Sequence, residues 1–282
     1  MYELYVKNSR GDRLQLTDTP DFITYKIEGL NPPQATINST ANTTIDGSDV
    51  NSVRLESRNI VIYTAIRGDI ERNRIKLYKH FPSKGVVTLY FKNSSRDVNI
   101  SGVVESVVVD QFQNPQIAQI SIFCGNPYFK DEKPLEISLS EIVPNFEFPF
   151  SIPEEGQPFS EYIVNYKKTI INPSDTDTSV TVTLYAAGEV INPTIYDLTH
   201  NKQMRLNLTL QDNDVVTINM HYDEKSIILT RNGKKTNALG YMRPDSKWFI
   251  LSAGDNVFTY SCESGAENLN ITFTAPILYS GV

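Results

Sequence analysis

The feature that most constrains the fold is a series of short strand-like segments in the C-terminal half of the chain. Val, Ile, Thr and aromatic residues alternate there with polar ones, and clusters of Gly, Pro, Asn and Asp separate the segments. They span residues 161–172, 179–186, 193–197, 204–210, 215–221, 225–230, 248–251, 257–262 and 269–278. Short strands at regular spacing, with no helical pattern between them, are typical of a β-sandwich or jelly roll.

Two turns in this half are strongly marked. Asn232-Gly233 between two strand-like runs is a typical two-residue hairpin turn. The single tryptophan, Trp248, begins a predicted strand, which a turn at Ala253-Gly254-Asp255-Asn256 separates from the next. We interpret Trp248 as an inward-facing core anchor, and Gly254 and Asn256 as turn residues that set the register. The alternative for Trp248 is a ligand platform.

The N-terminal half is predicted to contain strands and one helix. Strand-like segments span residues 2–16 (a hairpin), 22–30, 58–67, 86–92, 99–109 and 116–124. The helix is expected over residues 70–81, with Asp69 as its N-cap and Pro82 after its last residue. Ile70, Leu77, Tyr78 and Phe81 form its apolar stripe, with Arg74 beside them.

Residues 34–52 differ from both halves because they are small, polar and partly β-branched, with few apolar anchors. They predict a long exposed hairpin or loop. Such a segment is either a surface excursion or an arm that contacts a neighbouring subunit, and the sequence leaves both open. As candidate interface residues we take Ile37, Thr40, Thr43 and Ile45 here, with Arg72, Arg74 and Lys76 on the helix.

Composition and motifs argue against several classes of function. The chain of 282 residues has a formal net charge of -7, which argues against a nucleic-acid binder that works through a basic face. The sequence contains no motif of a metalloprotease, a phosphate loop or a nucleophile elbow. We therefore predict a protein without enzymatic activity, cofactor or metal. The two cysteines, Cys124 and Cys262, are expected to be reduced and structural.

The chain is predicted to form two domains and to stay out of the membrane. Lys130-Asp131-Glu132-Lys133-Pro134 is charged and carries a proline, as linkers do, so we expect domains at 1–132 and 133–282. No segment is apolar enough to span a bilayer. Residues 1–7 contain no signal-peptide core, so we expect the chain to be made in a cytoplasm.

The order of several motifs resembles one known family. The first half carries Ile66-Arg67-Gly68-Asp69 before the helix, then Gly102-Val103-Val104-Glu105, and closes with Cys124-Gly125-Asn126-Pro127-Tyr128-Phe129. The second half carries the Asn-Gly turn, Ser246-Lys247-Trp248-Phe249-Ile250-Leu251, Ala253-Gly254-Asp255-Asn256 and Tyr279-Ser280-Gly281-Val282. This order resembles the distal tail (Dit) proteins of long-tailed phages that infect Gram-positive bacteria. Ala253 departs from the family, in which a proline is expected.

The resemblance implies a mainly β structural protein of the virion tail tip. Its N-terminal domain would be a ring-forming β-sandwich with one helix and a long hairpin, and its C-terminal domain a galectin-like β-sandwich. The implied partners are copies of itself in a homo-hexamer, the tail tube protein, the tail-tip protein, and a receptor-binding protein or side fibre. DNA would pass transiently through the ring, and the chain would not insert into a membrane. The alternative function is a carbohydrate-binding module of the C-terminal domain that recognises the host surface.

Overall fold

The computed structural model describes residues 2–42, 44–144, 160–164 and 167–282, with only the backbone described at 140–144 and 160–164. Within them the fold is mainly β with one α-helix, as predicted. The chain divides into two compact units, Met1–Glu132 with Leu278–Val282, and Lys133–Ile277. Leu278–Val282, which the sequence placed in the second domain, therefore packs with the first unit.

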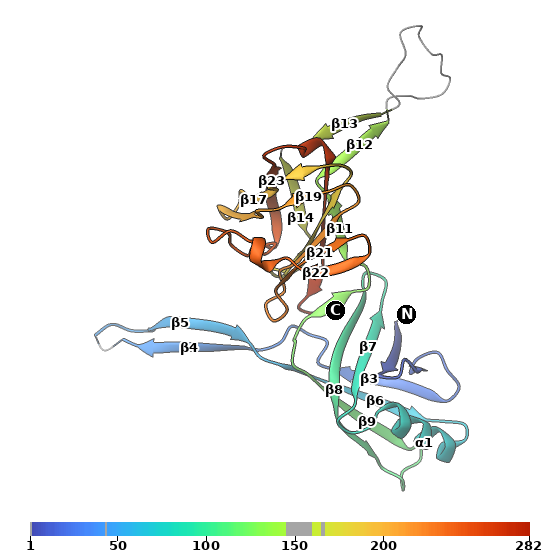
Figure 1. Cartoon of the computed structure of the whole chain (residues 1–282). Coiled ribbons are helices and arrows are strands. Elements are labelled where there is room, and N and C mark those ends of the chain that lie inside the picture. Colours follow the sequence, from blue (N-terminus) through green and yellow to red (C-terminus); the bar gives the residue numbers. More distant parts are fainter. Residues whose placement is uncertain (1, 43, 145–159, 165–166) are drawn as a thin grey trace. The chain divides into compact units, whose positions relative to one another are not determined.

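The first unit is built on an antiparallel sheet in the order β2-β1-β7-β8-β9-β6-β3 (Figure 1). β10 pairs with β8, and β25 pairs with β10. These strands are β1 (Glu3–Asn8), β2 (Arg13–Gln15), β3 (Phe22–Glu28), β6 (Arg58–Ile66), β7 (Val86–Lys92), β8 (Asp97–Val109), β9 (Ile117–Cys124), β10 (Phe129–Asp131) and β25 (Leu278–Tyr279). Leu4 in β1 and Ile62 in β6 lie in one core although several strands separate them, so the sheet curls around that core.

The single helix of the described residues, α1 (Ile70–His80), follows β6. The Asp69 side chain accepts the main-chain N–H of Arg72, which confirms the predicted N-cap. The buried face consists of Asn73 and Leu77. Tyr78, predicted to share the apolar stripe, is 39% exposed. Asn73 takes the inner position because its amide donates to the carbonyl of Arg67 at 2.7 Å.

A buried arginine holds the returning C-terminal segment in the first unit. Arg58 is 3% exposed, and its guanidinium donates to main-chain carbonyls of Gly29, Asn31, Pro127 and Ser280. It also lies 4.5 Å from the centre of the Phe129 ring. Burial lowers the pKa of Arg58 from its ordinary value. One side chain of β6 thus holds three other segments that are distant in sequence.

The second unit is a sandwich of two antiparallel sheets, with two shorter ribbons. The six-stranded sheet has the order β11-β24-β15-β20-β21-β22, the four-stranded sheet β14-β23-β17-β18, and the ribbons are β12-β13 and β16-β19 (several of these strands are labelled in Figure 1). The strands are β11 (Leu135–Ser138), β12 (Ser140–Pro144), β13 (Ser160–Val164), β14 (Lys168–Asn172), β15 (Thr181–Ala186), β16 (Val190–Ile191), β17 (Thr194–Asp197), β18 (Lys202–Arg205), β19 (Thr209–Leu210), β20 (Val215–Asn219), β21 (Ser226–Arg231), β22 (Lys234–Asn237), β23 (Gly254–Ser261) and β24 (Leu269–Ala275), and the 3-10 turns are Leu239–Tyr241 and Ala266–Asn268.

The core of the sandwich lies between its two sheets. Phe258 from the four-stranded sheet and Phe273 from the six-stranded sheet are buried with ring centres 4.7 Å apart, and Phe249 packs against both. The Asn232-Gly233 turn joins β21 to β22 with positive φ at both residues, as predicted. The segment predicted at 204–210 includes parts of two strands, because β18 pairs with β17 whereas β19 pairs with β16. The segment predicted at 161–172 includes β13 and β14.

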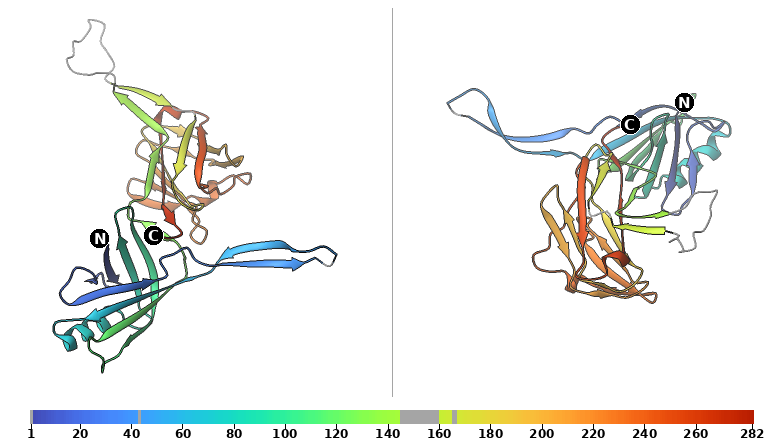
Figure 2. Two further views of the ribbon diagram at one scale, coloured as in Figure 1. Left: turned by 180° about the vertical axis from the view of Figure 1, so that it is seen from behind. Right: turned by 90° about the horizontal axis from the view of Figure 1, so that it is seen from above.

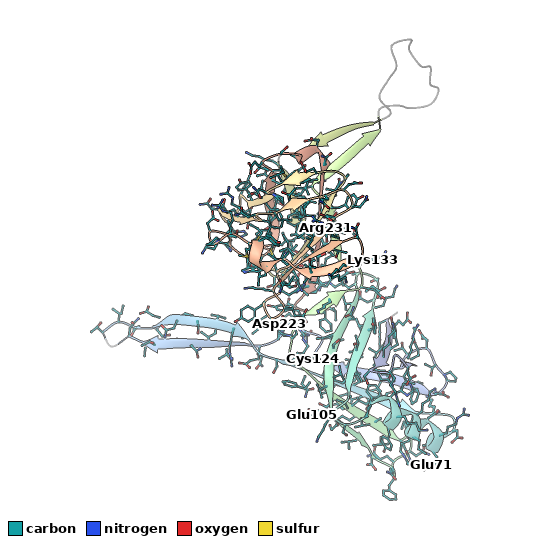
Figure 3. All side chains as sticks on the ribbon, in the orientation of Figure 1. Glu71, Glu105, Cys124, Lys133, Asp223 and Arg231 are labelled. Carbon is teal, nitrogen blue, oxygen red and sulfur yellow. The ribbon has the colours of Figure 1, made fainter. Side chains whose placement is uncertain are left out.

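In the second unit the buried carboxylate of Asp214 pairs with the partly exposed guanidinium of Arg231 (labelled in Figure 3). Nε of Arg231 lies 3.0 Å from both carboxylate oxygens of Asp214. Burial by itself raises the pKa of Asp214, but hydrogen bonds from Arg231 and from the main-chain N–H of Gln211 outweigh burial, so the pKa lies below its ordinary value. The pair therefore stabilises the fold while Asp214 is ionised.

Replacing Arg231 with methionine is expected to destabilise the second unit, because a buried carboxylate then lacks its cation. Since the folded-state pKa of Asp214 is lowered, the contribution is present above the unfolded-state pKa of about 4 and is lost as pH falls through the folded-state pKa. Denaturation followed by Trp248 fluorescence should give the largest difference between variant and parent near neutral pH. A difference that stays constant from neutral pH to about pH 3 would contradict the assignment.

Candidate assembly surfaces

A two-stranded arm is the most exposed element of the first unit. It consists of β4 (Ala35–Ala41) and β5 (Ser48–Leu55), which pair only with each other (Figures 1 and 2). A bulge follows Asn38, and every residue of β5 is exposed. The segment predicted as a long exposed hairpin or loop is thus a regular hairpin.

The arm has one polar and one apolar face. Ala35 lies opposite Leu55, and Ile37 lies opposite Val53. Because paired residues point to the same side of a hairpin, these side chains share one face, and Val50, opposite Ser39, extends it past the bulge. Ile37, Val50 and Val53 are 60%, 61% and 60% exposed. Such an apolar strip in a single chain indicates a contact surface.

The opposite face of the arm satisfies its polar groups internally. Asn38 donates to the hydroxyl of Ser52 at 2.9 Å, and Asn51 donates to the hydroxyl of Thr40 at 2.7 Å. Of the candidate interface residues, Thr40 therefore belongs to the polar face, and Ile45, 70% exposed, lies in the turn at the tip. Thr43 lies outside the described residues.

The cationic residues of the helix are used differently from one another. Arg72 is exposed. Arg74 pairs with Glu71 at 2.5 Å, and its side chain is only 12% exposed. Lys76 lies 3.5 Å from Asp21 and over the ring of Phe22. Arg74 and Lys76 thus contact residues of their own chain. Of the three cationic residues, only Arg72 is exposed in the described structure.

A second apolar row crosses the outer face of the curled sheet. Val86 in β7 lies opposite Val103 in β8, which lies opposite Phe123 in β9. They are 53%, 41% and 46% exposed. The sequence did not reveal this row because its members are distant in the chain and meet only through the strand register. Glu105, labelled in Figure 3, accepts from Ser121 at 2.7 Å on the same face.

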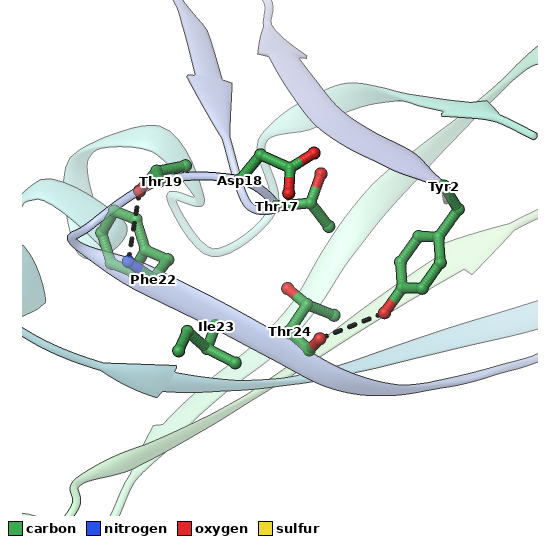
Figure 4. A pocket seen from close by; sticks show the side chains of 7 residues that line it. All are labelled: Tyr2, Thr17, Asp18, Thr19, Phe22, Ile23 and Thr24. Atoms are coloured by element: carbon green, nitrogen blue, oxygen red, sulfur yellow. Dashed lines mark hydrogen bonds between the residues drawn. The ribbon is translucent and has the colours of Figure 1, made fainter.

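A cavity of about 440 Å³ lies where the two edges of the curled sheet approach each other (Figure 4). Tyr2 donates to the carbonyl of Thr24 at 3.1 Å, and the Thr19 hydroxyl accepts the N–H of Phe22 at 3.3 Å. Asp18 and Ile23 also line the cavity. Its lining contains no histidine, cysteine or lysine, and the hydroxyls of Thr17 and Thr19 accept main-chain N–H groups.

One cluster in the second unit has the hydrogen-bond arrangement of a hydrolytic triad, Asp–His–Ser. Nδ1 of His200 lies 2.7 Å from Asp197, and Nε2 lies 2.9 Å from the hydroxyl of Ser252. An acyl-transfer site also needs free main-chain N–H groups beside the nucleophile. Here the N–H of Ser252 donates to Asn256 and that of Ala253 donates to Asp177. The cluster therefore joins β17 to the turn before β23 and has no oxyanion site at these positions.

The two cysteines are not reactive groups either. Burial raises the pKa of the Cys124 thiol to about 11 and that of the Cys262 thiol to about 12. Neither is a thiolate nucleophile near neutral pH. Both cysteines are free, and no group of three or more His, Cys, Asp or Glu residues in the described ranges is arranged to hold a metal. No described helix is long and apolar enough to cross a membrane.

The stretch around Trp248 differs from its prediction. Residues 248–250 are not in a strand, and Leu251 forms only an isolated bridge with Thr178. Trp248 is half-buried at the margin of the core, with Lys225 over its ring, whereas the fully buried ring belongs to Phe249. The sequence predicted a strand here, in which Trp248 and Phe249 would point to opposite faces. The alternating pattern does not show which of the two faces points into the core, and the sequence therefore indicated Trp248 as the anchor in place of Phe249.

Gly254 and Asn256, predicted as turn residues, lie at the start of β23, where they pair with β14. Gly254 has φ +87°, which favours glycine. Asn256 is fully buried, and its amide accepts the N–H of Ser252 at 2.8 Å and donates to the carbonyls of Ser252 and Gly254. One side chain thus closes the turn.

Phe249→Ala is expected to destabilise the second unit by about 3–5 kcal/mol, because it leaves a cavity among three packed rings. Trp248→Ala should cost less, about 1–2 kcal/mol, since its ring is only half-buried. Circular dichroism during denaturation measures both, with Tyr222→Ala, at a site 92% exposed, as the control. Equal losses for the two ring deletions would show that Trp248 is the anchor.

Residues 173–276 match the family described as siphovirus-type tail component, C-terminal domain. The second unit carries a siphovirus tail component domain. The whole fold is similar to that of the SPP1 Dit protein, described as a paradigm of the hub adsorption apparatus in phages that infect Gram-positive bacteria. That likeness has a TM-score of 0.70 at 12% identity and covers 98% of this chain and 99% of the other.

Chains of the phage P2 baseplate, solved in its activated conformation with Ca and with Sr, are also similar. Their TM-scores are 0.57 and 0.58 at 12% and 13% identity, over 100% of both chains in each case. At this identity the likeness concerns the fold. Comparison with curated proteins found no match in sequence. The resemblance to distal tail proteins is thus confirmed by a family domain in the second unit and by the fold of the whole chain.

Proposed function

We propose that the chain is a structural hub of a phage tail tip. Copies of it would close into a ring, of about six chains as the family resemblance implies. The ring would join the tail tube to the tail-tip protein. Receptor-binding proteins or side fibres would attach to it, and DNA would pass through its channel. The chain would act by assembly and would catalyse no reaction.

The observation that carries this proposal is the apolar face of the arm. Ile37, Val50 and Val53 lie side by side, each about three-fifths exposed, on a hairpin that contributes nothing to the core of its own unit. A closed ring would bury this strip against the neighbouring copy and repeat the contact around the axis. The row Val86-Val103-Phe123 offers a second apolar surface for the same purpose.

The charge of the chain is consistent with DNA passage. The formal net charge is -7, so a ring of several copies is strongly acidic. Tight phosphate binding requires clustered cations and would slow the passage of DNA. A mainly acidic ring would instead let DNA through without retaining it.

Sedimentation velocity of the purified chain, alone and mixed with the tail tube and tail-tip proteins of the same genome, tests the proposal. We expect one sharp species of about six chains, and co-sedimentation with both partners. The mixtures are needed because a tail-tip ring can require its tail tube or tail-tip partner in order to assemble. A chain that remains monomeric in every mixture would refute the hub function.

A further inference from the structure

The outer face of the four-stranded sheet in the second unit carries two neighbouring polar cavities. The first, of about 250 Å³, is lined by Thr194, Arg205, Asn207, Arg243, Ser261 and Glu263, among others. The second, of about 360 Å³, is lined by Tyr196, Gln203, Asp245 and Lys247, among others. The smaller cavity has the volume of about eight water molecules, which suits one small polar ring.

The strand register makes the two cavities one groove. Thr194 in β17 lies opposite Arg205 in β18 and opposite Ser261 in β23, so these three side chains share a face. Tyr196 lies two positions further along β17, about 7 Å away, opposite Gln203. The intervening Ile195 is buried in the core, on the other face. We call this surface the polar groove.

A single carboxylate positions the cationic groups of the polar groove. Asp245 accepts a hydrogen bond from Gln203 at 3.0 Å. It also lies 3.5 Å from Nη1 of Arg205 and 3.3 Å from Nε of Arg243. Asp245, which lines the second cavity, thus contacts two partly exposed guanidinium groups that line the first. Guanidinium groups can form paired hydrogen bonds to the oxygen atoms of a ligand.

Two donors at the polar groove make no hydrogen bond to any described residue. Thr194 is 4% exposed, and its hydroxyl makes no hydrogen bond to any described residue. Nε of Arg205 is buried with no hydrogen-bond partner among the described residues. Nε of Arg205 has no accessible surface of its own and does not face the cavity. Because buried polar groups are normally paired, the unpaired hydroxyl of Thr194 in the cavity lining indicates a ligand with oxygen atoms. Glu263, at the rim, supplies an acceptor for hydroxyl groups.

Tyr196 gives the polar groove an aromatic surface. Its hydroxyl lies 3.3 Å from the hydroxyl of Ser261 on the neighbouring strand, two positions away along the sheet. The ring must therefore extend along the sheet face between the two cavities. A ring in this position can stack against the apolar side of a sugar, while guanidinium and amide groups bind its hydroxyl oxygens.

We propose that the polar groove binds a saccharide of at least two units, one in each cavity. Arg205, Arg243 and Thr194 donate to its hydroxyl oxygens, Glu263 accepts from its hydroxyl groups, and Tyr196 stacks between the units. This inference rests on the second unit alone and does not depend on ring formation.

The test uses the full chain on an array of bacterial surface saccharides, neutral, phosphate-bearing and carboxylate-bearing, followed by titration of the best one by NMR. Arg243→Ala and Thr194→Val should each lower the affinity about tenfold, as expected for the loss of one or two hydrogen bonds. Circular dichroism confirms that both variants are folded. The array also distinguishes a neutral from a charged saccharide.

Tyr222→Ala is the matched control, because Tyr222 is an exposed aromatic of the same unit beside Lys225, outside the groove. We expect unchanged affinity for this variant. Three results would overturn the inference: no binding to any saccharide, binding that both groove substitutions leave unchanged, or binding that Tyr222→Ala abolishes. The last would place the ligand at the Trp248–Lys225–Tyr222 cluster instead.

Discussion

A Val53→Asp variant is expected to stay monomeric under conditions in which the parent chain forms rings. Val53 lies opposite Ile37 at the centre of the apolar face of the arm and is 60% exposed in the single chain. In the assembly this carboxylate would be buried against the neighbouring copy without a cation. An uncompensated buried charge costs at least about 3 kcal/mol, which weakens each contact by a factor of roughly a hundred or more. Native mass spectrometry measures the loss.

The control for this variant lies on the same hairpin. Ser52→Asp introduces the same charge on the polar face, where Ser52 accepts from Asn38, so the ring should persist. Both positions are exposed in the single chain, and the unfolding free energy of either variant should stay within about 0.5 kcal/mol of the parent. If Val53→Asp still forms rings, or if the two variants dissociate equally, the apolar face of the arm is not the contact.

Arg58→Met is expected to destabilise the first unit by about 3–5 kcal/mol, because several main-chain carbonyls each lose a hydrogen bond from a charged donor, worth about 1.5–3 kcal/mol apiece. Methionine keeps the aliphatic stem but leaves the carbonyls of Gly29, Asn31, Pro127 and Ser280 without their donor. Differential scanning calorimetry should show an earlier transition for the first unit. The transition of the second unit, followed by Trp248 fluorescence, should not move.

A chain shortened at its C-terminus tests whether Arg58 stabilises the first unit by holding the C-terminal segment. A chain ended at Ile277 lacks Ser280 and should be destabilised in the same unit. Combining it with Arg58→Met should cost less than the sum of the two, because both changes remove the same contact. Arg96→Met, which removes one donor to Gly281, should cost less than Arg58→Met. Additive losses, or an unchanged first transition in Arg58→Met, would refute this role of the arginine.

Local signals in the sequence were sufficient for the elements that short-range chemistry determines. Asp69 caps α1, and Asn232-Gly233 forms a hairpin turn. The exposed arm followed from a long polar segment with few apolar anchors. These features depend on residues within a few positions of one another, so one sequence reveals them.

Features that depend on distant pairing could not be predicted in the same way. Leu278 lies opposite Lys130 in the first unit, although the linker pattern near residue 132 placed all of 133–282 in the second domain. The row Val86-Val103-Phe123 exists only in the register of three strands. The polar groove likewise joins residues from three strands, and no motif in the sequence marks it.

Electron microscopy of the purified chain, with its tail tube and tail-tip proteins added where needed, tests the central claim most directly. We expect class averages of a closed ring with about six-fold symmetry and an open central channel, and loss of these rings for Val53→Asp but not for Ser52→Asp. Single chains or open, irregular aggregates in every mixture would contradict a tail-tip hub.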